Sequence, residues 1–270
     1  MRAKPLIVTS TLISGLLVGA AAPVAAEPAP NWGGFYVDGA LGFRNTQYKV
    51  TNFTQYSESY TLGGTYSTAN SGSSDLGSSN FLGQISAGWR WAPGPVVVGI
   101  GLFADLASAN KASTTFNSSW SNSPTGTSGF TYSTIQVKEK NRYGLSLDVG
   151  PNWRTSPYAK FAANWADYSV STAADSCGMA GTTAATGNSF TNHQNGFGVG
   201  AGIRHLQTDN LYFFAEIMWT GMGSKTKTVS GGCVPNANAV ALGVVNQNRS
   251  QQVKISPTDY TGVIGVGWKF

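Results

Sequence analysis

The chain has 270 residues and a formal net charge of +5, yet charged residues make up only 11% of it. Ordinary soluble domains carry about 25% charged residues; here Gly, Ser, Thr, Asn and aromatic residues take their place. No Lys/Arg-rich run of the kind that binds nucleic acid is present. The run Gly198–Gly202 imitates a nucleotide-binding loop, but no helix pattern follows it. We therefore expect neither a nucleic-acid partner nor a cofactor.

The first 26 residues have the pattern of a secretory signal peptide. A short basic start, "MRAK", precedes an apolar stretch, and small residues lead up to Glu27. A membrane anchor is the alternative, but the apolar stretch is short and Pro23 and Pro28 follow it closely. No run of about twenty apolar residues occurs later, so we expect no helix of the exported chain to span a bilayer. We predict cleavage after Ala26, export, and one domain over residues 27–270.

Eight segments of the exported sequence alternate apolar and polar residues, the pattern of strands with two different faces. In one of them, for example, Leu145 and Leu147 alternate with Ser146. The segments are residues 35–44, 81–91, 96–106, 142–150, 158–168, 195–205, 211–219 and 260–270.

The connections between these segments alternate in length. Three are tight turns rich in Pro, Asp and Asn, namely "APGP", "RTSP" and "LQTDN". The other four run for about 25–40 mostly polar residues, where compact domains prefer about 4–6. Long loops therefore emerge at one end, while short turns and both termini lie at the other. The prediction is an all-β, eight-stranded antiparallel up-and-down β-barrel.

The two faces of the strands indicate what surrounds the barrel. A soluble barrel turns its apolar face inward around a ligand, whereas a membrane barrel turns it outward to lipid. Here the apolar face carries aromatic residues near both strand ends, which matches the two membrane–water interfaces. These are Trp89, Trp91, Phe213, Trp268 and Phe270 at the short-turn end, and Phe43, Phe81, Tyr143, Trp165, Phe197, Trp219 and Tyr260 at the long-loop end.

The opposite face combines small glycines with charged residues, which suits a crowded lumen. Ten charged side chains are predicted to point into it: Asp38, Arg44, Arg90, Asp105, Arg142, Asp148, Lys160, Arg204, Glu216 and Lys269. A soluble exterior would gain nothing from glycines at these places. We therefore predict a transmembrane β-barrel with four long extracellular loops and short periplasmic turns.

The last strand ends on Phe270 and must pair with the first, because lipid cannot satisfy an open sheet edge. With "NWGGFYVDGALG" near the start and "GVGWKF" at the end, the chain resembles the small outer-membrane barrels of Gram-negative bacteria. These are the OmpA-like transmembrane barrels and the opacity-type surface-antigen porins. The resemblance implies an outer-membrane location and a signal for the barrel-assembly machinery at Tyr260, Trp268 and Phe270. Because the chain stops at Phe270, we do not expect the periplasmic peptidoglycan-binding domain of longer relatives.

An eight-stranded barrel is just wide enough to be filled by side chains, so we expect the inward charges to pair and plug the lumen. The leading hypothesis is a monomeric, non-catalytic barrel that supports envelope integrity and meets a host or surface ligand through its loops. A narrow porin for small solutes is the alternative. An outer-leaflet lipid-modifying enzyme ranks third, because His193 has Ser189 and Thr191 nearby but no compact nucleophile–base–acid cluster.

Six lysines fall near the predicted outer rim, where they would meet phosphates of lipopolysaccharide: Lys111, Lys138, Lys140, Lys225, Lys227 and Lys254. Simple solvation explains them nearly as well. Cys177 and Cys233 fall in the third and fourth long loops, and export permits a disulfide between them; two free thiols are the alternative. With His193 and His205 as the two histidines, we expect no metal site.

Overall fold

The computed structural model describes residues 30–60, 65–106, 111–122, 127–174, 185–233 and 244–270. They form ten strands: β1 (Gly34–Tyr60), β2 (Thr65–Trp91), β3 (Val96–Asp105), β4 (Ala112–Asn122), β5 (Thr127–Pro151), β6 (Thr155–Ala174), β7 (Ala185–Leu206), β8 (Leu211–Met222), β9 (Lys225–Cys233) and β10 (Val244–Lys269). None of the described residues belongs to a helix long and apolar enough to cross a membrane. The predicted cleavage after Ala26 lies outside the described residues.

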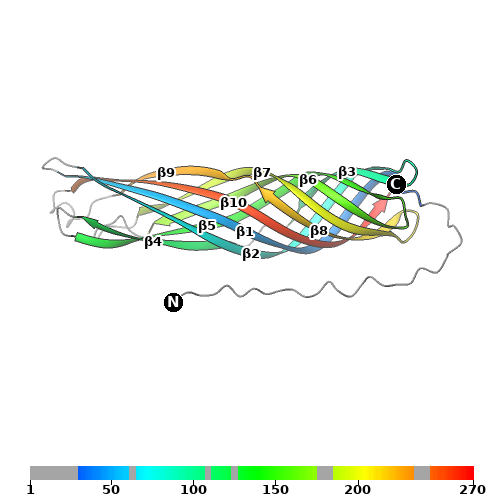
Figure 1. Ribbon diagram of the computed structural model, residues 1–270, viewed down its shortest axis with the longest axis horizontal. Coiled ribbons are helices and arrows are strands. Elements are labelled where there is room, and N and C mark those ends of the chain that lie inside the picture. The colour runs from blue at the N-terminus through cyan, green and yellow to red at the C-terminus, as the bar shows by residue number, and fades with distance from the viewer. Residues whose placement is uncertain (1–29, 61–64, 107–110, 123–126, 175–184, 234–243) are drawn as a thin grey trace.

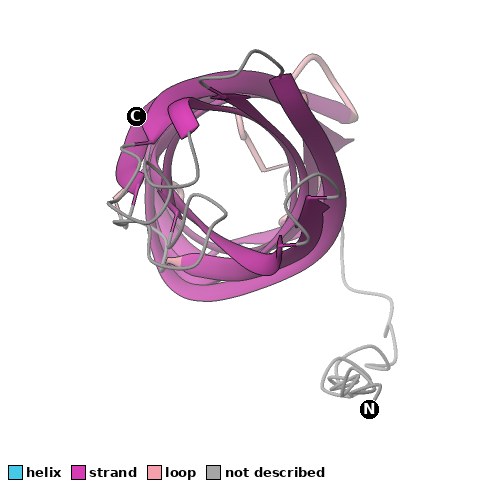
Figure 2. Ribbon diagram, turned by 90° about the vertical axis from the view of Figure 1, so that its left-hand side faces the viewer, coloured by secondary structure: helices cyan, strands magenta, loops and turns pink. Residues whose placement is uncertain are grey.

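Eight of the strands close into a ring. Each pairs with the next, antiparallel, in the order β1, β2, β3, β5, β6, β7, β8 and β10, and β10 returns to β1. Figures 1 and 2 show the resulting cylinder from the side and from one end. β4 continues the line of β3 along β5, and β9 continues that of β8 along β10. The predicted eight-stranded antiparallel barrel is confirmed.

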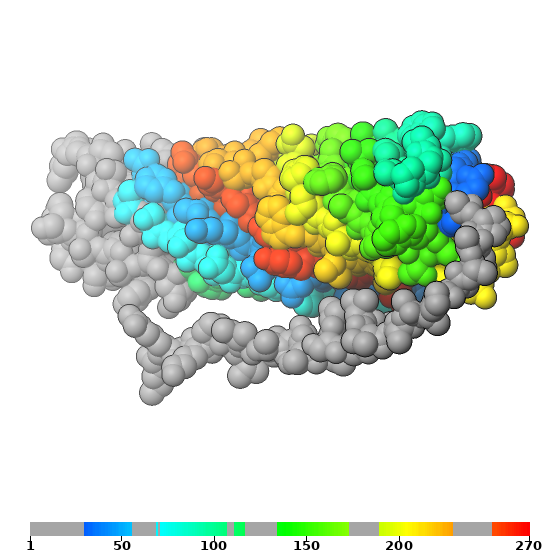
Figure 3. Space-filling view, turned by 45° about the vertical axis from the view of Figure 1, so that its right-hand side comes forward, coloured from blue at the N-terminus to red at the C-terminus, as the bar shows by residue number. Residues whose placement is uncertain are grey.

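A band of apolar side chains faces outward around this ring. Leu102, Leu41 and Ile264, for example, are 65%, 57% and 70% exposed. The aromatic residues predicted for the two interfaces all face outward as well, and Phe43 meets Phe81 edge to face with ring centroids 5.7 Å apart. Figure 3 shows one side of the cylinder, where neighbouring strands pack into a continuous surface. An apolar band of this kind requires hydrocarbon around it.

The strands continue much further than the sequence alternation indicated. β1 and β2 each have 27 residues, so most of the polar segments predicted as long loops belong to four tall hairpins. We call the part beyond the outer aromatic row the head. It comprises β4 and β9 together with β1 from Asn45, β2 up to Asn80, β5 up to Asn141, β6 from Ala166, β7 up to Asn195 and β10 up to Asp259.

The polarity of the two faces reverses in the head. On β1, Asn45, Gln47 and Lys49 are exposed on the outer face, whereas Tyr48 and Val50 are fully buried inside. Lower on the same strand the outer face is apolar. Because water replaces lipid around the head, its apolar side chains must turn inward. The reversal therefore marks the outer boundary of the membrane.

The ring is closed only within the membrane band. β2 pairs with β3 over Gln84–Trp91, and β7 pairs with β8 over Gly196–Leu206. Further out, the described residues form no backbone ladder between β2 and β4 or between β7 and β9. The head therefore consists of two four-stranded sheets, β9-β10-β1-β2 and β4-β5-β6-β7. Water can hydrogen-bond to the unpaired backbone groups of these edge strands, whereas lipid cannot.

An apolar cluster fills the space between the two sheets of the head. Its buried members are Tyr48, Val50, Ala112, Ile135, Val137, Ala166, Tyr168, Val170, Met222, Val253 and Ile255. Tyr48 and Tyr168 meet edge to face across the middle, with ring centroids 6.1 Å apart. Burial raises the pKa of both hydroxyls, so both rings stay neutral. The cluster closes the outer end of the lumen.

The C-terminus completes the barrel at its inner end. The Phe270 backbone N–H donates to the Phe35 carbonyl at 2.9 Å, and the two rings lie 5.8 Å apart. One residue earlier, the Lys269 N–H donates to the Asn210 carbonyl at 2.8 Å. The terminal residues therefore bond to chain on both sides of β10, which is why the sequence keeps its alternation to the end.

Replacing Phe270 with Ser is expected to destabilise the folded barrel by about 2 kcal/mol, because a large ring leaves the lipid-facing belt. The fraction that resists unfolding in unheated gel samples should fall with it. Trp153→Ser is the control, since Trp153 is 61% exposed in a short turn. Equal folded fractions for the two variants would contradict a closing role for the terminus.

Candidate functional site: the lumen and the outer wall

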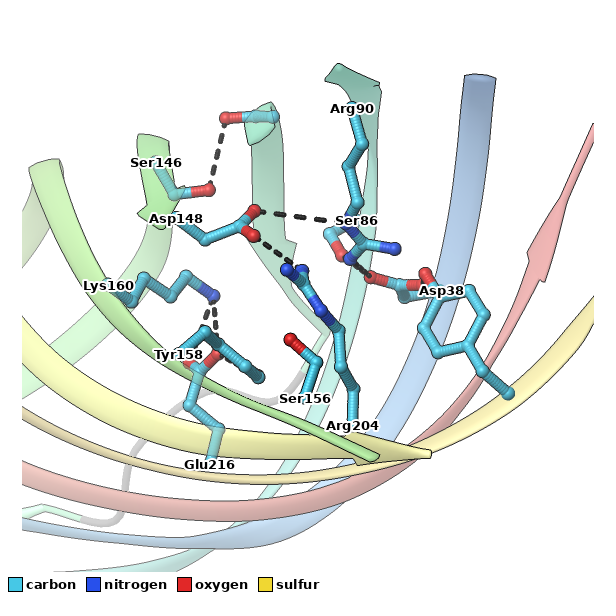
Figure 4. Close-up of polar contacts among 12 residues, drawn as sticks. Asp38, Ser86, Arg90, Ser146, Asp148, Ser156, Tyr158, Lys160, Arg204 and Glu216 are labelled. Atoms are coloured by element: carbon cyan, nitrogen blue, oxygen red, sulfur yellow. Dashed lines mark hydrogen bonds and ion pairs between the residues drawn. The ribbon is translucent and has the colours of Figure 1, made fainter. Parts of the chain in front are cut away.

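Charged side chains fill the inner half of the lumen (Figure 4). We call this group the inner charge layer; its members are Asp38, Arg90, Asp148, Lys160, Arg204 and Glu216. The Lys160 ammonium donates to both carboxylate oxygens of Glu216 at 2.9 Å. Arg204 Nη1 donates to Asp148 Oδ1 at 2.5 Å. Three cations face three anions, so the layer is balanced in charge.

Hydroxyl groups satisfy much of the remaining hydrogen-bonding capacity of this layer. Ser86 donates to Asp38 at 3.0 Å, and Tyr212 donates to the other oxygen of the same carboxylate. Tyr158 donates to Glu216 at 3.0 Å. The cavity among these side chains measures about 20 Å³, room for roughly one water molecule. The open centre of the ribbon in Figure 2 is therefore filled by side chains at this level.

Trp32 seals the inner end beneath the charge layer. Its indole is fully buried and donates from Nε1 to the Trp153 carbonyl at 2.7 Å. The Arg204 guanidinium lies 4.9 Å and that of Arg90 5.8 Å from the indole ring, and the Tyr212 ring packs against it at 5.3 Å. The indole thus stacks on cations that would otherwise face the periplasm. Sequence reasoning missed this role, because Trp32 precedes the first strand and shows no periodicity.

A second group of charges, the outer charge layer, lies near the outer aromatic row. It contains Arg44, Asp105, Glu139, Arg142 and Asp259, whose side chains are nearly inaccessible. Arg44 bonds Asp105 and donates from Nη1 to Glu139 Oε1 at 2.8 Å. Arg142 bonds Asp259, and its Nε lies 3.4 Å from Glu139. Ion pairs that bridge β1, β3, β5 and β10 thus tie the wall together.

The structure places all ten charged residues predicted for the lumen on the inner face. Lys269 is buried at the inner end, 8% exposed, and the other nine belong to the two charge layers. Two members of the outer layer, Glu139 and Asp259, were missed. Asp259 precedes Tyr260, where the predicted strand began one residue too late. Glu139 lies beside a register shift between Glu139 and Asn141, which hides its direction from a simple alternation.

The histidine considered for catalysis lies on the open outer wall of the head. His193 Nδ1 is 2.5 Å from Asp167 Oδ1 across the β6–β7 ladder, and the imidazole is 75% exposed. Thr191 is the next outward residue along β7, and Ser189 follows it. His205 lies at the inner end, 2.8 Å from the Thr155 hydroxyl. Among the residues with described side chains, no group of three or more His, Cys, Asp or Glu could hold a metal ion.

The six lysines predicted for the outer rim divide into two groups. Lys111, Lys138 and Lys140 lie on the outer wall at β4 and β5, and Lys225, Lys227 and Lys254 lie on β9 and β10. For the predicted disulfide, Cys177 lies outside the described residues and Cys233 is the last residue of β9. The bond between them stays a prediction.

Comparison with known families identifies the architecture. The model of the outer membrane protein beta-barrel domain matches residues 12–247. The chain belongs to this family. An outer-membrane location follows from this membership. No curated protein sequence matches this outer-membrane barrel.

Several solved structures resemble this outer-membrane barrel at low identity. OprG of Pseudomonas aeruginosa is 14% identical with a TM-score of 0.43, over 90% of this chain and 99% of that one. The protease OmpT of Escherichia coli is 13% identical with a TM-score of 0.38, over 88% and 97%. Neisserial surface protein A is 15% identical with a TM-score of 0.30, over 83% and 97%.

Arg142→Leu is expected to destabilise the barrel by about 3–5 kcal/mol, because it leaves the buried Asp259 carboxylate without its partner. The shift should appear in the urea midpoint of unfolding from lipid vesicles. The double variant Arg142→Leu/Asp259→Leu removes both charges and should recover part of the loss. A single variant as stable as the wild type would show that the outer charge layer does not hold the wall together.

Proposed function

We propose that this outer-membrane barrel is a sealed, monomeric, non-catalytic protein that supports envelope integrity and offers its head to partners outside the cell. The observation that supports it most is the blocked lumen. Along the axis a solute would meet Trp32, the inner charge layer, the outer charge layer and the apolar cluster of the head in turn.

The energetics of the charge layers favour a sealed resting state. Passage of a solute requires separating buried ion pairs, and an unpaired buried charge costs about 3–5 kcal/mol. The side chains of Arg142 and Asp259 are 1% and 0% exposed, so the pair is shielded from bulk water. The buried ion pairs thus link neighbouring strands and make the barrel rigid, which suits a protein that supports the envelope.

The head supplies the surface for the proposed interactions. It carries exposed polar side chains outside and two seams that no backbone ladder bridges among the described residues. Across one of them the Thr114 hydroxyl donates to Ser74 at 3.0 Å. A host or surface ligand would therefore meet the hairpins rather than a cavity. Tyr260, Trp268 and Phe270 are proposed to guide the chain to the barrel-assembly machinery, since all three face outward on the closing strand.

A narrow porin is the second candidate. Glu139 Oε2 and Asp259 Oδ1 are buried without a hydrogen-bond partner among the described residues. Buried polar atoms of this kind usually bond to water. A thin file of water through the outer charge layer would favour slow passage of small solutes over a complete seal.

Planar bilayer recordings separate the two candidates. The wild-type barrel is expected to show no sustained openings, because each level of the lumen is filled. A variant that thins all four blocking levels and removes ion pairs as whole pairs is expected to conduct: Trp32→Ala, Lys160→Ala/Glu216→Ala, Arg142→Ala/Asp259→Ala and Tyr48→Ala combined. Lys49→Gln, which changes an exposed residue of the same wall, should stay closed. Sustained wild-type conductance would favour the porin.

A deletion strain tests the proposed role in the cell. Loss of the gene is expected to increase leakage of a periplasmic enzyme and to reduce surface adhesion. His193→Ala/Asp167→Asn should restore both fully, because the proposed role needs no catalysis. A barrel with shortened β6–β7 and β9–β10 hairpins should restore only the leakage. If the His193 variant restored neither phenotype, the non-catalytic assignment would be wrong.

A further inference from the structure

An apolar groove crosses the lipid-facing wall of the barrel. It measures about 630 Å³ and runs over β2, β1, β10, β8 and β7. Leu41, Ile217 and Ile264 stand along it, while Ala215 and Gly262 leave the floor low. A Cβ atom added at Gly262 would have no heavy atom within 4 Å, so the groove is open at this point. Large and small side chains thus alternate around a trough in the hydrocarbon band.

The groove begins at the outer membrane interface. Phe43 and Phe81, two members of the outer aromatic row, line its outer end. Along the ladders Phe43 pairs with Gly262, and Ile264 pairs with Ala215 closer to the inner end. The trough therefore extends from the headgroup boundary into the hydrocarbon, as an acyl chain of the outer leaflet does.

Among the described residues, three lysines of the outer wall form no ion pair with a carboxylate. The register Ala112↔Val137 places Lys111 opposite Lys138 at the next step, and Lys140 is turned outward at the register shift of β5. Like charges that face each other across a ladder are destabilising. Within the part of the chain that the structure describes, no carboxylate forms an ion pair with any of the three. Nearby Asp167 is occupied by His193.

These lysines lie on the same side of the barrel as the outer end of the groove. The Leu106 N–H donates to the Gly83 carbonyl at 2.8 Å, and a Cβ at Gly83 would lie 3.5 Å from Leu106 and 4.0 Å from Leu41. Leu106 at the end of the described β3 segment thus adjoins the groove wall. In the head, Thr114 of β4 donates to the Ser74 hydroxyl of β2 at 3.0 Å, so β4 lies beside β2, the strand that carries Phe81.

The height of the lysines corresponds to the headgroup layer. Lys140 is three residues beyond Tyr143 of the outer aromatic row, about 10 Å along the strand at roughly 3.3 Å per residue. The polar layer of a bilayer extends about 5–8 Å beyond each side of the hydrocarbon. A strand tilted by about 40° therefore brings Lys140 to the level of lipid phosphates. Lys138 and Lys111 start about 5 Å higher, within the reach of a lysine side chain.

We propose that this wall holds one molecule of lipopolysaccharide, with an acyl chain of its lipid A in the groove and its phosphate against Lys111, Lys138 and Lys140. The inference rests on the proposed function in one respect, that the head lies outside the cell; it does not need a sealed lumen. An extracellular polyanion would explain the lysines but not the groove below them. A second copy of the chain would bring the same cations face to face.

Native mass spectrometry of the full-length barrel in detergent tests the site, with bisphosphorylated lipid A as the probe. Gly262→Leu fills the groove, and K111Q/K138Q/K140Q removes the phosphate contacts. The lysine variant is expected to weaken binding at least tenfold, because each lysine near a membrane surface contributes about a factor of five. Gly262→Leu is also expected to weaken binding at least tenfold, because its side chain occupies the space of the acyl chain. Gly39→Leu is the control for the first, because Gly39 is equally open but does not line the groove. K225Q/K227Q/K254Q is the control for the second.

Dephosphorylated lipid A and phosphatidylglycerol complete the experiment. Both should bind at least tenfold more weakly than the bisphosphorylated form to the wild type. Equal binding by phosphatidylglycerol would overturn the assignment to lipopolysaccharide. Equal loss in a variant and its control, or loss only in the lysine variant, would overturn the combined site. Conductance of the same preparations reports the seal separately, so a failed lipid site leaves the proposed function standing.

Discussion

Lipid offers no hydrogen-bond partner to a peptide group, and a sheet inside a membrane must therefore close on itself. In this molecule the eight strands are joined into a ring by ladders within the apolar band, from the Phe270–Phe35 bond at the inner end toward the outer aromatic row. The described β7–β8 ladder ends at Gly196, beside Phe197 of that row, and the described β2–β3 ladder ends at Gln84, three residues short of Phe81. The sheet is therefore closed where lipid surrounds it, and its strand edges are left unpaired where water surrounds it.

The same change of solvent decides which face of each strand is mainly apolar, although apolar side chains such as Leu82 and Phe103 also point into the lumen of the band. Within the band, apolar groups face lipid and the charges that remain must find each other inside, which produces the two balanced or nearly balanced charge layers. In the head, apolar groups turn inward and pack as Tyr48 and Tyr168 do. The inward apolar cluster then lies directly over the inward charges. The lumen is blocked because the apolar cluster of the head lies directly above the charge layers of the membrane band.

Alternation alone was enough to predict the band, because each strand there keeps one apolar and one polar face. It stopped short of the head for the same reason: the apolar face of β1 changes sides near Asn45, so the alternation is interrupted there although the strand continues to Tyr60. Glu139 was hidden by an irregular register, and Trp32 by its position before the first strand. The groove depends on residues from five strands, a proximity that becomes visible only once the register is known.

Spin labels at two outward positions of β1 test the account most directly. In a vesicle-embedded barrel, a label at Leu41 should be accessible to oxygen and shielded from a water-soluble nickel complex, while a label at Gln47 should show the reverse. Both side chains are exposed on the outer face, so neither label disturbs packing. If the Leu41 label were shielded from oxygen, or as open to nickel as the Gln47 label, the arrangement of apolar wall and polar interior would be contradicted.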